Sequence, residues 1–160
     1  MMRYSSGFTL VELMIVVAII AFLSMIAVPG FFRFLAKAKR AEAYMHLGAI
    51  YASERSYWAE HGKYSAQLAG VDGVGWQPEG YKGNHIQEKF TYTYGFAEGS
   101  EGSHHFTGKL GASPAELKGT HAEKNSFIAA AVGDIDGDGY TDLLTVNELN
   151  DIVITQDDLA

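Results

Sequence analysis

An apolar stretch near the N-terminus constrains this chain more than any other feature. Every side chain from Leu13 through Val28 is apolar except Ser24, and one carboxylate, Glu12, stands just before the run. As a helix rising about 1.5 Å per residue, Phe8 to Val28 would be about 31 Å long, close to the thickness of the hydrocarbon core of a bilayer. The stretch therefore predicts a membrane-spanning helix. Because a charge at the centre of such a segment costs about 2.5–3.5 kcal/mol, Glu12 is a functional candidate.

The residues around this stretch occur in the reverse order of an ordinary secretory signal peptide, in which a small-residue cleavage site follows the apolar core. Here the small residue, Gly7, precedes the core and is followed by Phe-Thr-Leu-Val-Glu, and Pro29 follows the run. At these residues the chain resembles the type IV pilin family and its relatives, the pseudopilins of type II secretion. The resemblance is specific, because an apolar run alone would not fix a glycine, a phenylalanine, a glutamate and a proline at these spacings.

The resemblance implies a processing site and an assembly site. A prepilin peptidase on the cytoplasmic side would cut after Gly7, and Phe8 would be N-methylated at the new N-terminus. Glu12 would pair with the amine of Phe8 on a neighbouring subunit, because either charge alone would be costly in a dry filament core. Pro29 would loosen the helix locally, since proline lacks a backbone donor and clashes with the preceding turn.

Two features depart from the family pattern. Ala21 stands where the family usually has Gly, which favours a continuous helix there. The leader carries only Arg3, whereas several basic residues follow the span, so the positive-inside rule alone would place the C-terminal side in the cytoplasm. The resemblance implies the opposite orientation, with a cytoplasmic N-terminus, and we follow it because the leader motif implies a cytoplasmic-side peptidase.

Beyond Pro29 the pattern predicts that the helix continues, now amphipathic, to about His61, with Gly62 in the C-cap position. One apolar strip would face neighbouring subunits and the other would face the protein's own head. The run from Ala41 to Ser65 also resembles the corresponding helix end of pilins from myxobacteria and their relatives. Aromatic residues alternate with polar or small ones over residues 90–96, which predicts a strand with one aromatic face. Further strands are expected at residues 104–110, 127–132, 143–146 and 152–155.

The predicted fold class is α+β, with a long N-terminal helix packed on a C-terminal antiparallel sheet, as in the type IV pilin fold. The predicted division is a cleaved leader (1–7), a transmembrane and filament-core helix (8–29), an amphipathic helix continuing into the head (30–62) and a globular head with a connecting loop and the sheet (63–160). Residues 111–125 are expected to be irregular and exposed.

Composition narrows the classes of function. The net charge is −7, and loss of Arg3 with the leader would make it −8, which argues against nucleic acid as the main partner. The chain has no cysteine, so the disulfide that closes the C-terminal region of many type IV pilins cannot form here. No nucleophile–base pair, phosphate loop or zinc motif points to an enzyme, and the histidines lack metal-ligand spacing.

The segment GDIDGDGYTD is a second dense signal. Four aspartates fall at positions 1, 3, 5 and 9 of a calcium-binding loop, with a backbone carbonyl at position 7. The residues at these positions are Asp134, Asp136, Asp138, Asp142 and Tyr140. Position 12 is Thr145 rather than Glu, and the flanks are strand-like, unlike an EF-hand. We expect Ca²⁺ here; the alternative is an Asp/Gly-rich turn between two strands, without metal.

The resemblance implies a structural subunit, a major pilin, that polymerises with copies of itself through its N-terminal helix. The precursor would lie in the inner membrane, meet the prepilin peptidase and the inner-membrane pilus assembly machinery, and end in an extracellular filament for adhesion, twitching motility or DNA uptake. One alternative is a type II secretion pseudopilin, whose usual calcium site near the C-terminus fits the aspartate loop. Another is a monomeric, membrane-anchored calcium-binding protein.

Overall fold

A computed structural model describes residues 7–159 of the protein. Of the predicted leader, residues 1–6 lie outside the described residues and only Gly7 is described. Contacts within the chain divide it between Leu35 and Ala36 into two compact units. The predicted boundary at residue 29 lies inside the first of these units.

Helix α1 runs from Leu10 to His61 without interruption, through both Ala21 and Pro29. Within the first unit it is long and apolar enough to cross a membrane, as predicted. The residues from Leu10 through Phe34 are exposed, except Gly30, which is half-buried. The helix ends where Gly62 adopts a left-handed conformation (φ 68°) and donates its backbone N–H to the carbonyl of Trp58 at 2.8 Å. This geometry confirms the predicted C-cap.

The second unit begins where α1 becomes amphipathic. The buried residues of α1 recur at intervals of three, four and seven, which places them on one helical face. They are Ala36, Ala43, Leu47, Ile50 and Glu54. The opposite face, including Ala41 and Met45, is exposed. Of the two predicted apolar strips, the one that includes Leu47 and Ile50 is buried against the protein's own sheet, and the one that includes Ala41 and Met45 is exposed.

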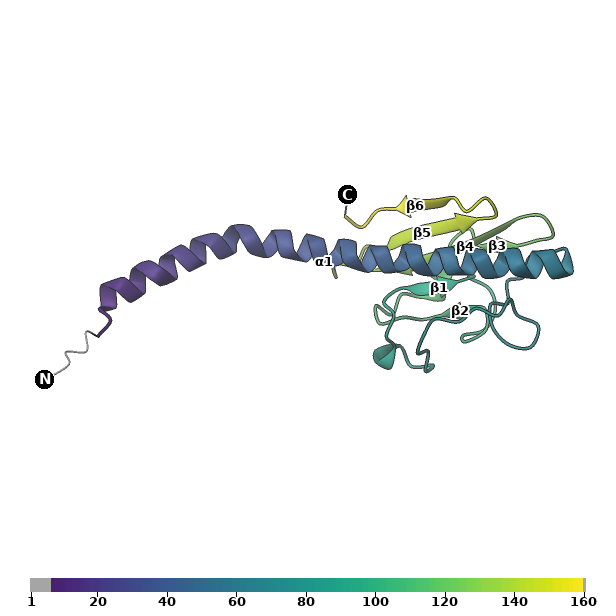
Figure 1. The fold of residues 1–160 in the computed structure, drawn as a ribbon, viewed down its shortest axis with the longest axis horizontal. Coiled ribbons are helices and arrows are strands. Elements are labelled where there is room, and N and C mark those ends of the chain that lie inside the picture. Colours follow the sequence, from purple (N-terminus) through teal and green to yellow (C-terminus); the bar gives the residue numbers. More distant parts are fainter. Residues whose placement is uncertain (1–6, 160) are drawn as a thin grey trace, which may run out of the picture. The chain divides into compact units, whose positions relative to one another are not determined.

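The sheet has six strands, and every pair is antiparallel. The strands are β1 (Thr93–Gly95), β2 (His105–Phe106), β3 (His121–Ala122), β4 (Phe127–Gly133), β5 (Asp142–Asn147) and β6 (Ile152–Gln156). Their order is β2-β1-β4-β5-β6, with β3 also paired to β4. In Figure 1, α1 crosses the sheet with β1 and β2 on one side and β5 and β6 on the other. Two short 3₁₀ helices lie at His85–Gln87 and Pro114–Glu116.

The strands β4, β5 and β6 confirm the predictions closely, whereas the first predicted strand is shorter than its pattern. Phe90, Tyr92 and Phe96 are buried as expected, but only Thr93–Gly95 pairs as a strand. Before it, the backbone N–H of Thr91 donates to the carboxylate of Glu42 on α1 at 2.7 Å. Strand β3 lies in the segment expected to be irregular. An alternating pattern of aromatic and polar residues predicts which side chains are buried. It does not predict which backbone groups form hydrogen bonds with a neighbouring strand.

Both faces of the central strands are buried. The main core lies between α1 and the sheet and includes Leu47, Tyr94, Phe106 and Ala131. A smaller cluster on the opposite face contains Ala112, Leu117, Ala130, Val132 and Leu143. Successive residues of β4 therefore belong to different clusters, as the two-residue period of a strand requires. Ala112 and Leu117, on either side of the 3₁₀ helix at Pro114–Glu116, contribute to the cover on this second face.

Candidate functional site: the helix start and the acidic loop

The start of α1 is closed by a reciprocal pair of hydrogen bonds between Thr9 and Glu12. The Thr9 hydroxyl oxygen accepts from the backbone N–H of Glu12 at 3.2 Å. In return, Glu12 Oε2 accepts from the backbone N–H of Thr9 at 2.9 Å and from its hydroxyl at 2.7 Å. This arrangement is a capping box, which satisfies backbone donors that the first turn of a helix leaves free. Sequence reasoning missed this role, although the spacing Thr-x-x-Glu is its signature.

The predicted processing residues precede the helix. Gly7 and Phe8 lie outside regular secondary structure and are exposed, so the peptide bond between them is not enclosed in a helix or strand. A β-carbon added at Gly7 would meet nothing within 4 Å among the described residues. Pro29 lies inside α1, where its ring leaves one carbonyl of the preceding turn without its usual donor. Cleavage at Gly7, methylation of Phe8 and the assembly roles of Glu12 and Pro29 stay predictions.

The acidic loop joins β4 to β5 and folds around its own aspartates. Asp134 accepts backbone N–H groups from Gly137 at 2.6 Å and Gly139 at 3.0 Å. Asp136 accepts from the N–H of Asp138 at 3.2 Å. Both glycines have left-handed backbones (φ 89° and 92°), which side chains rarely allow. The loop is therefore closed by hydrogen bonds to its own aspartates and by two glycines in the left-handed conformation.

The structure corrects one member of the predicted metal set. The carboxylate of Asp142 is fully buried at the start of β5 and binds Arg40 of α1, with Nε–Oδ2 at 3.0 Å and Nη2–Oδ1 at 2.6 Å. The hydroxyl of Tyr92 also donates to Oδ2 at 2.8 Å. Asp158, which follows β6, takes its place: its carboxylate and those of Asp134, Asp136 and Asp138 lie within 4.8 Å of one another. Tyr140 remains in the loop, where its N–H donates to Asp138 at 2.8 Å.

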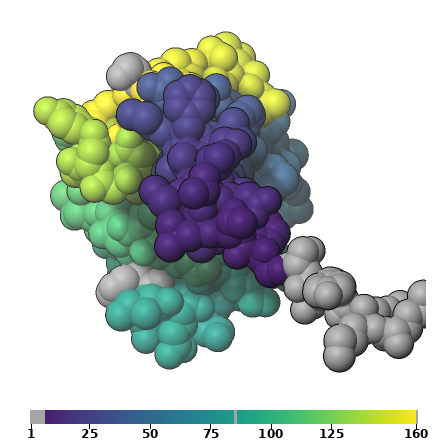
Figure 2. Space-filling model, turned by 90° about the vertical axis from the view of Figure 1, so that its left-hand side faces the viewer, coloured from purple at the N-terminus to yellow at the C-terminus, as the bar shows by residue number. Residues whose placement is uncertain are grey.

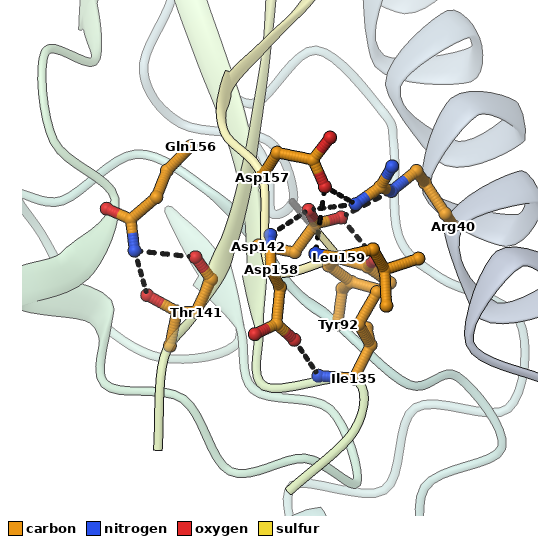
Figure 3. Close-up of polar contacts among 9 residues, drawn as sticks. All are labelled: Arg40, Tyr92, Ile135, Thr141, Asp142, Gln156, Asp157, Asp158 and Leu159. Carbon is orange, nitrogen blue, oxygen red and sulfur yellow. Dashed lines mark hydrogen bonds and ion pairs between the residues drawn. The ribbon is translucent and has the colours of Figure 1, made fainter. Parts of the chain in front are cut away.

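Two basic residues connect α1 to this region. Arg40 bridges Asp142 and Asp157, the latter at 2.5 Å (Figure 3). Burial acts to lower the pKa of Arg40, but its hydrogen bonds and the charges of the two aspartates outweigh burial and raise it. The same hydrogen bond lowers the pKa of Asp157. Lys39 donates its amino group to the carbonyl of Ile135 in the acidic loop at 2.6 Å. Helix, loop and C-terminal segment therefore share one polar network.

Asp158 has one satisfied oxygen and one unsatisfied oxygen. Its Oδ2 accepts the backbone N–H of Ile135 at 2.8 Å, whereas Oδ1 is buried and has no hydrogen-bond partner among the described residues. Burial raises the pKa of Asp158; the N–H of Ile135 opposes that shift, and the charges of Asp136, Asp134 and Asp138 add to it. The group of four carboxylates could hold a metal ion through oxygen ligands.

Comparisons with known proteins give separate matches for the N-terminal segment and for the region of β4, β5 and β6. Residues 2–28 match the model of the prokaryotic N-terminal methylation motif, and residues 127–157 match that of the FG-GAP repeat. The chain is 51% identical over 59 residues to the type IV major pilin protein PilA of Myxococcus xanthus (strain DK1622), which covers 37% of this chain and 27% of that protein. It is 34% identical over 82 residues to a type IV major pilin protein PilE1 of Neisseria gonorrhoeae, covering 51% of this chain and 49% of that protein.

A third relative, the fimbrial protein EcpC of Eikenella corrodens, is 36% identical over 67 residues, covering 42% of this chain and 44% of that protein. The chain thus spans about half or less of the length of the curated relatives it matches. The methylation motif, the partial similarity to major pilins and the packing of one long N-terminal helix on an antiparallel sheet are all features in which the chain resembles type IV pilins.

Proposed function

We propose that the protein is the structural subunit of a type IV pilus, polymerising with copies of itself through α1. The observation that carries the proposal is the exposed apolar surface of Leu10–Leu35, where large hydrophobic side chains such as Leu13, Ile20 and Phe31 are more than half exposed. A contiguous apolar surface of this size is not left in water by soluble proteins. It is covered first by lipid and then, in a filament, by the same helix of other subunits.

Under this proposal the precursor lies in the inner membrane with its N-terminus in the cytoplasm. A prepilin peptidase removes residues 1–7, the inner-membrane pilus assembly machinery adds the subunit to the filament, and the filament extends outside the cell. Such a filament would serve adhesion, twitching motility or DNA uptake. The protein acts as a building block and not as an enzyme.

Glu12 has two roles in this proposal. Within the subunit it caps α1 through Thr9, which satisfies hydrogen bonds but gives the carboxylate no ion pair among residues 7–159. Cleavage at Gly7 creates a positive amine at Phe8, and in the dry interior of a filament the carboxylate and an amine from another subunit offset each other's desolvation. The pairing would favour one axial register during assembly.

Substitutions at Glu12 separate the two roles. Glu12→Gln keeps the capping box, because glutamine accepts the same backbone N–H, but it removes the charge. Glu12→Ala removes both. With no wild-type subunit present, we expect both variants to insert into the membrane and both to yield few filaments, measured by electron microscopy and by pilin recovered after shearing. Normal filaments from Glu12→Gln, with few from Glu12→Ala, would leave Glu12 only its capping role.

Mass spectrometry of sheared filaments tests the processing step. We expect the mature protein to begin at Phe8 and to carry one added methyl group on its amine. Gly7→Leu should leave uncleaved precursor in the membrane fraction, whereas Ser6→Ala, a change beside the cleavage site, should be processed normally. A mature protein that begins at another residue would refute the assignment.

Deletion of the gene distinguishes this function from the two alternatives. A pilus subunit predicts surface fibres that disappear on deletion and return on complementation. A type II secretion pseudopilin predicts loss of secretion with surface fibres unchanged. A membrane-anchored monomer predicts that, in wild-type cells, the protein is absent from the fraction released by shearing.

A further inference from the structure

Four carboxylates converge at one end of the sheet, although only three of them are close in sequence. Asp134, Asp136 and Asp138 come from the β4–β5 loop, and Asp158 comes from the segment after β6. Figure 2 shows the C-terminal residues, in yellow, next to the yellow-green residues of the β4–β5 region on the molecular surface. Four negative charges at this distance repel one another, so the arrangement raises the free energy of the folded loop unless a cation neutralises it.

Asp158 supplies the observation that separates this cluster from an ordinary acidic turn. The residue is 9% exposed, and the N–H of Ile135 holds its Oδ2, while Oδ1 is buried without a hydrogen-bond partner. A buried carboxylate oxygen without a partner is costly and is uncommon in native proteins. A turn that only connected β4 to β5 would not require a buried carboxylate from a distant segment. A bound cation accounts for both the convergence and the unpaired oxygen.

We propose that Asp134, Asp136, Asp138 and Asp158 bind one Ca²⁺ ion, and that this ion fastens the C-terminal segment to the β4–β5 loop. The donor set consists of carboxylate oxygens, which favour hard cations, and it contains no histidine or cysteine. Ca²⁺ accepts six to eight oxygens in flexible geometry, so the backbone carbonyl of Tyr140 and water can complete the shell. A surface hollow lined by Tyr140, Gln156 and Asp158 leaves room for that water.

The ion would also stabilise the packing of α1, because residues next to its proposed ligands form hydrogen bonds with the helix. The carbonyl of Ile135, next to Asp134, accepts a hydrogen bond from the amino group of Lys39. The carboxylate of Asp157, next to Asp158, accepts one from Arg40. Fixing the loop and the C-terminal segment therefore fixes the hydrogen-bond acceptors of both Lys39 and Arg40 on α1, and Figure 3 shows those of Arg40. In a chain without cysteine, the ion performs the closure that a C-terminal disulfide would otherwise provide.

Calorimetric titration of the full-length, chelator-treated protein in detergent micelles tests the proposal. We expect one Ca²⁺ per chain, bound at least tenfold more tightly than Mg²⁺. Asp158→Asn and Asp134→Asn should each weaken binding at least tenfold. Asp151→Asn, an exposed change in the turn before β6, should bind as the wild type does. Wild-type affinity in Asp158→Asn, or no binding by the wild-type chain, would overturn the site.

Hydrogen exchange measured by mass spectrometry tests the fastening. Addition of Ca²⁺ should slow exchange in Ile152–Leu159 at least tenfold in the wild-type chain and leave Asp158→Asn unchanged. Similar exchange of β4 in both chains, in the presence of chelator, establishes that the variant is folded. Binding without slower exchange in the C-terminal segment would overturn the fastening. Because both measurements use the unassembled chain, their outcome is independent of whether the protein forms pili.

Discussion

The two parts of helix α1 contain similar apolar side chains, yet only one part has its cover within the same chain. Leu23, in the first unit, is 59% exposed, whereas Leu47, in the second unit, is fully buried. The more apolar part of the helix is thus the exposed one. Hydrophobicity alone does not determine burial inside a chain; the arrangement of the apolar residues around the helix does.

The arrangement differs because the first part is apolar on all sides and the second is apolar on the face toward the sheet. One sheet covers one face of a helix, so a helix that is apolar all round requires a bilayer or several other helices. In the second part, buried residues recur along a single face, and the remainder is a mixture of charged residues such as Lys37 and Arg55 with small or apolar ones such as Ala41. Each part of α1 therefore specifies its own kind of partner.

Removal of residues 1–35 should produce the largest effect. We expect the fragment Ala36–Ala160 to be soluble without detergent and to lose membrane association completely, because the exposed apolar surface is gone. Its melting temperature, followed by circular dichroism, should lie within a few degrees of that of the full chain in micelles. A fragment that is unfolded at 25 °C would show that the boundary at Leu35 does not separate independent units.

Shortening one leucine in each part of α1 sharpens the comparison. Leu47→Ala should destabilise the detergent-solubilised chain by about 3 kcal/mol, because it leaves a cavity in a packed core. Leu23→Ala should change the stability of the same monomer by less than about 0.5 kcal/mol, as at an exposed position. Chemical denaturation of the two variants measures the difference. Equal losses would mean that the head also covers the first part of the helix.

Loss of the guanidinium at position 40 should have a smaller effect. Arg40→Met leaves the fully buried carboxylate of Asp142 without its cation, and breaking a buried pair is destabilising. We expect about 2 kcal/mol, since Arg40 is itself 14% exposed and Tyr92 still donates to Asp142. Lys37→Met, at an exposed position of the same helix, provides the control and should unfold as the wild type does. A wild-type unfolding curve for Arg40→Met would show that the pair contributes nothing net.

Glu54 provides a test whose effect is small over any single pH unit. Burial raises the pKa of Glu54 from 4.5 to about 8, while the N–H of Ser65 opposes the shift. Between these values the folded chain holds a proton that the unfolded chain has released, so stability falls as pH rises and the decline ends above about pH 8. From pH 5 to 6 the loss due to this group is about 1 kcal/mol.

Glu54→Gln, which stays neutral, should remove this part of the pH dependence, measured by denaturation at closely spaced pH values. Glu60→Gln, on the exposed side of the same helix, should retain the wild-type dependence. A wild-type slope in Glu54→Gln would assign the dependence to other groups.

The features that sequence reasoning predicted are those written in neighbouring residues. The order of Gly7, Phe8 and Glu12 before an apolar run, the amphipathic continuation to His61 and the strand-like runs of β4 and β5 each depend on residues a few positions apart. The capping box at Thr9 belongs to the same class, because Thr-x-x-Glu is visible in the sequence. Local spacing determines which face of a helix or strand is apolar, and these faces determined the fold class.

Tertiary structure decided which distant groups meet. Asp142 belongs to the loop motif by spacing, but its place at the start of β5 turns its carboxylate toward Arg40. Asp158 has no motif of its own, and it joins Asp134 because β6 pairs with β5 and returns the chain to the loop. Spacing along the sequence cannot report such a meeting, since it results from the pairing of whole strands. The composition of the acidic cluster is therefore a property of the folded sheet.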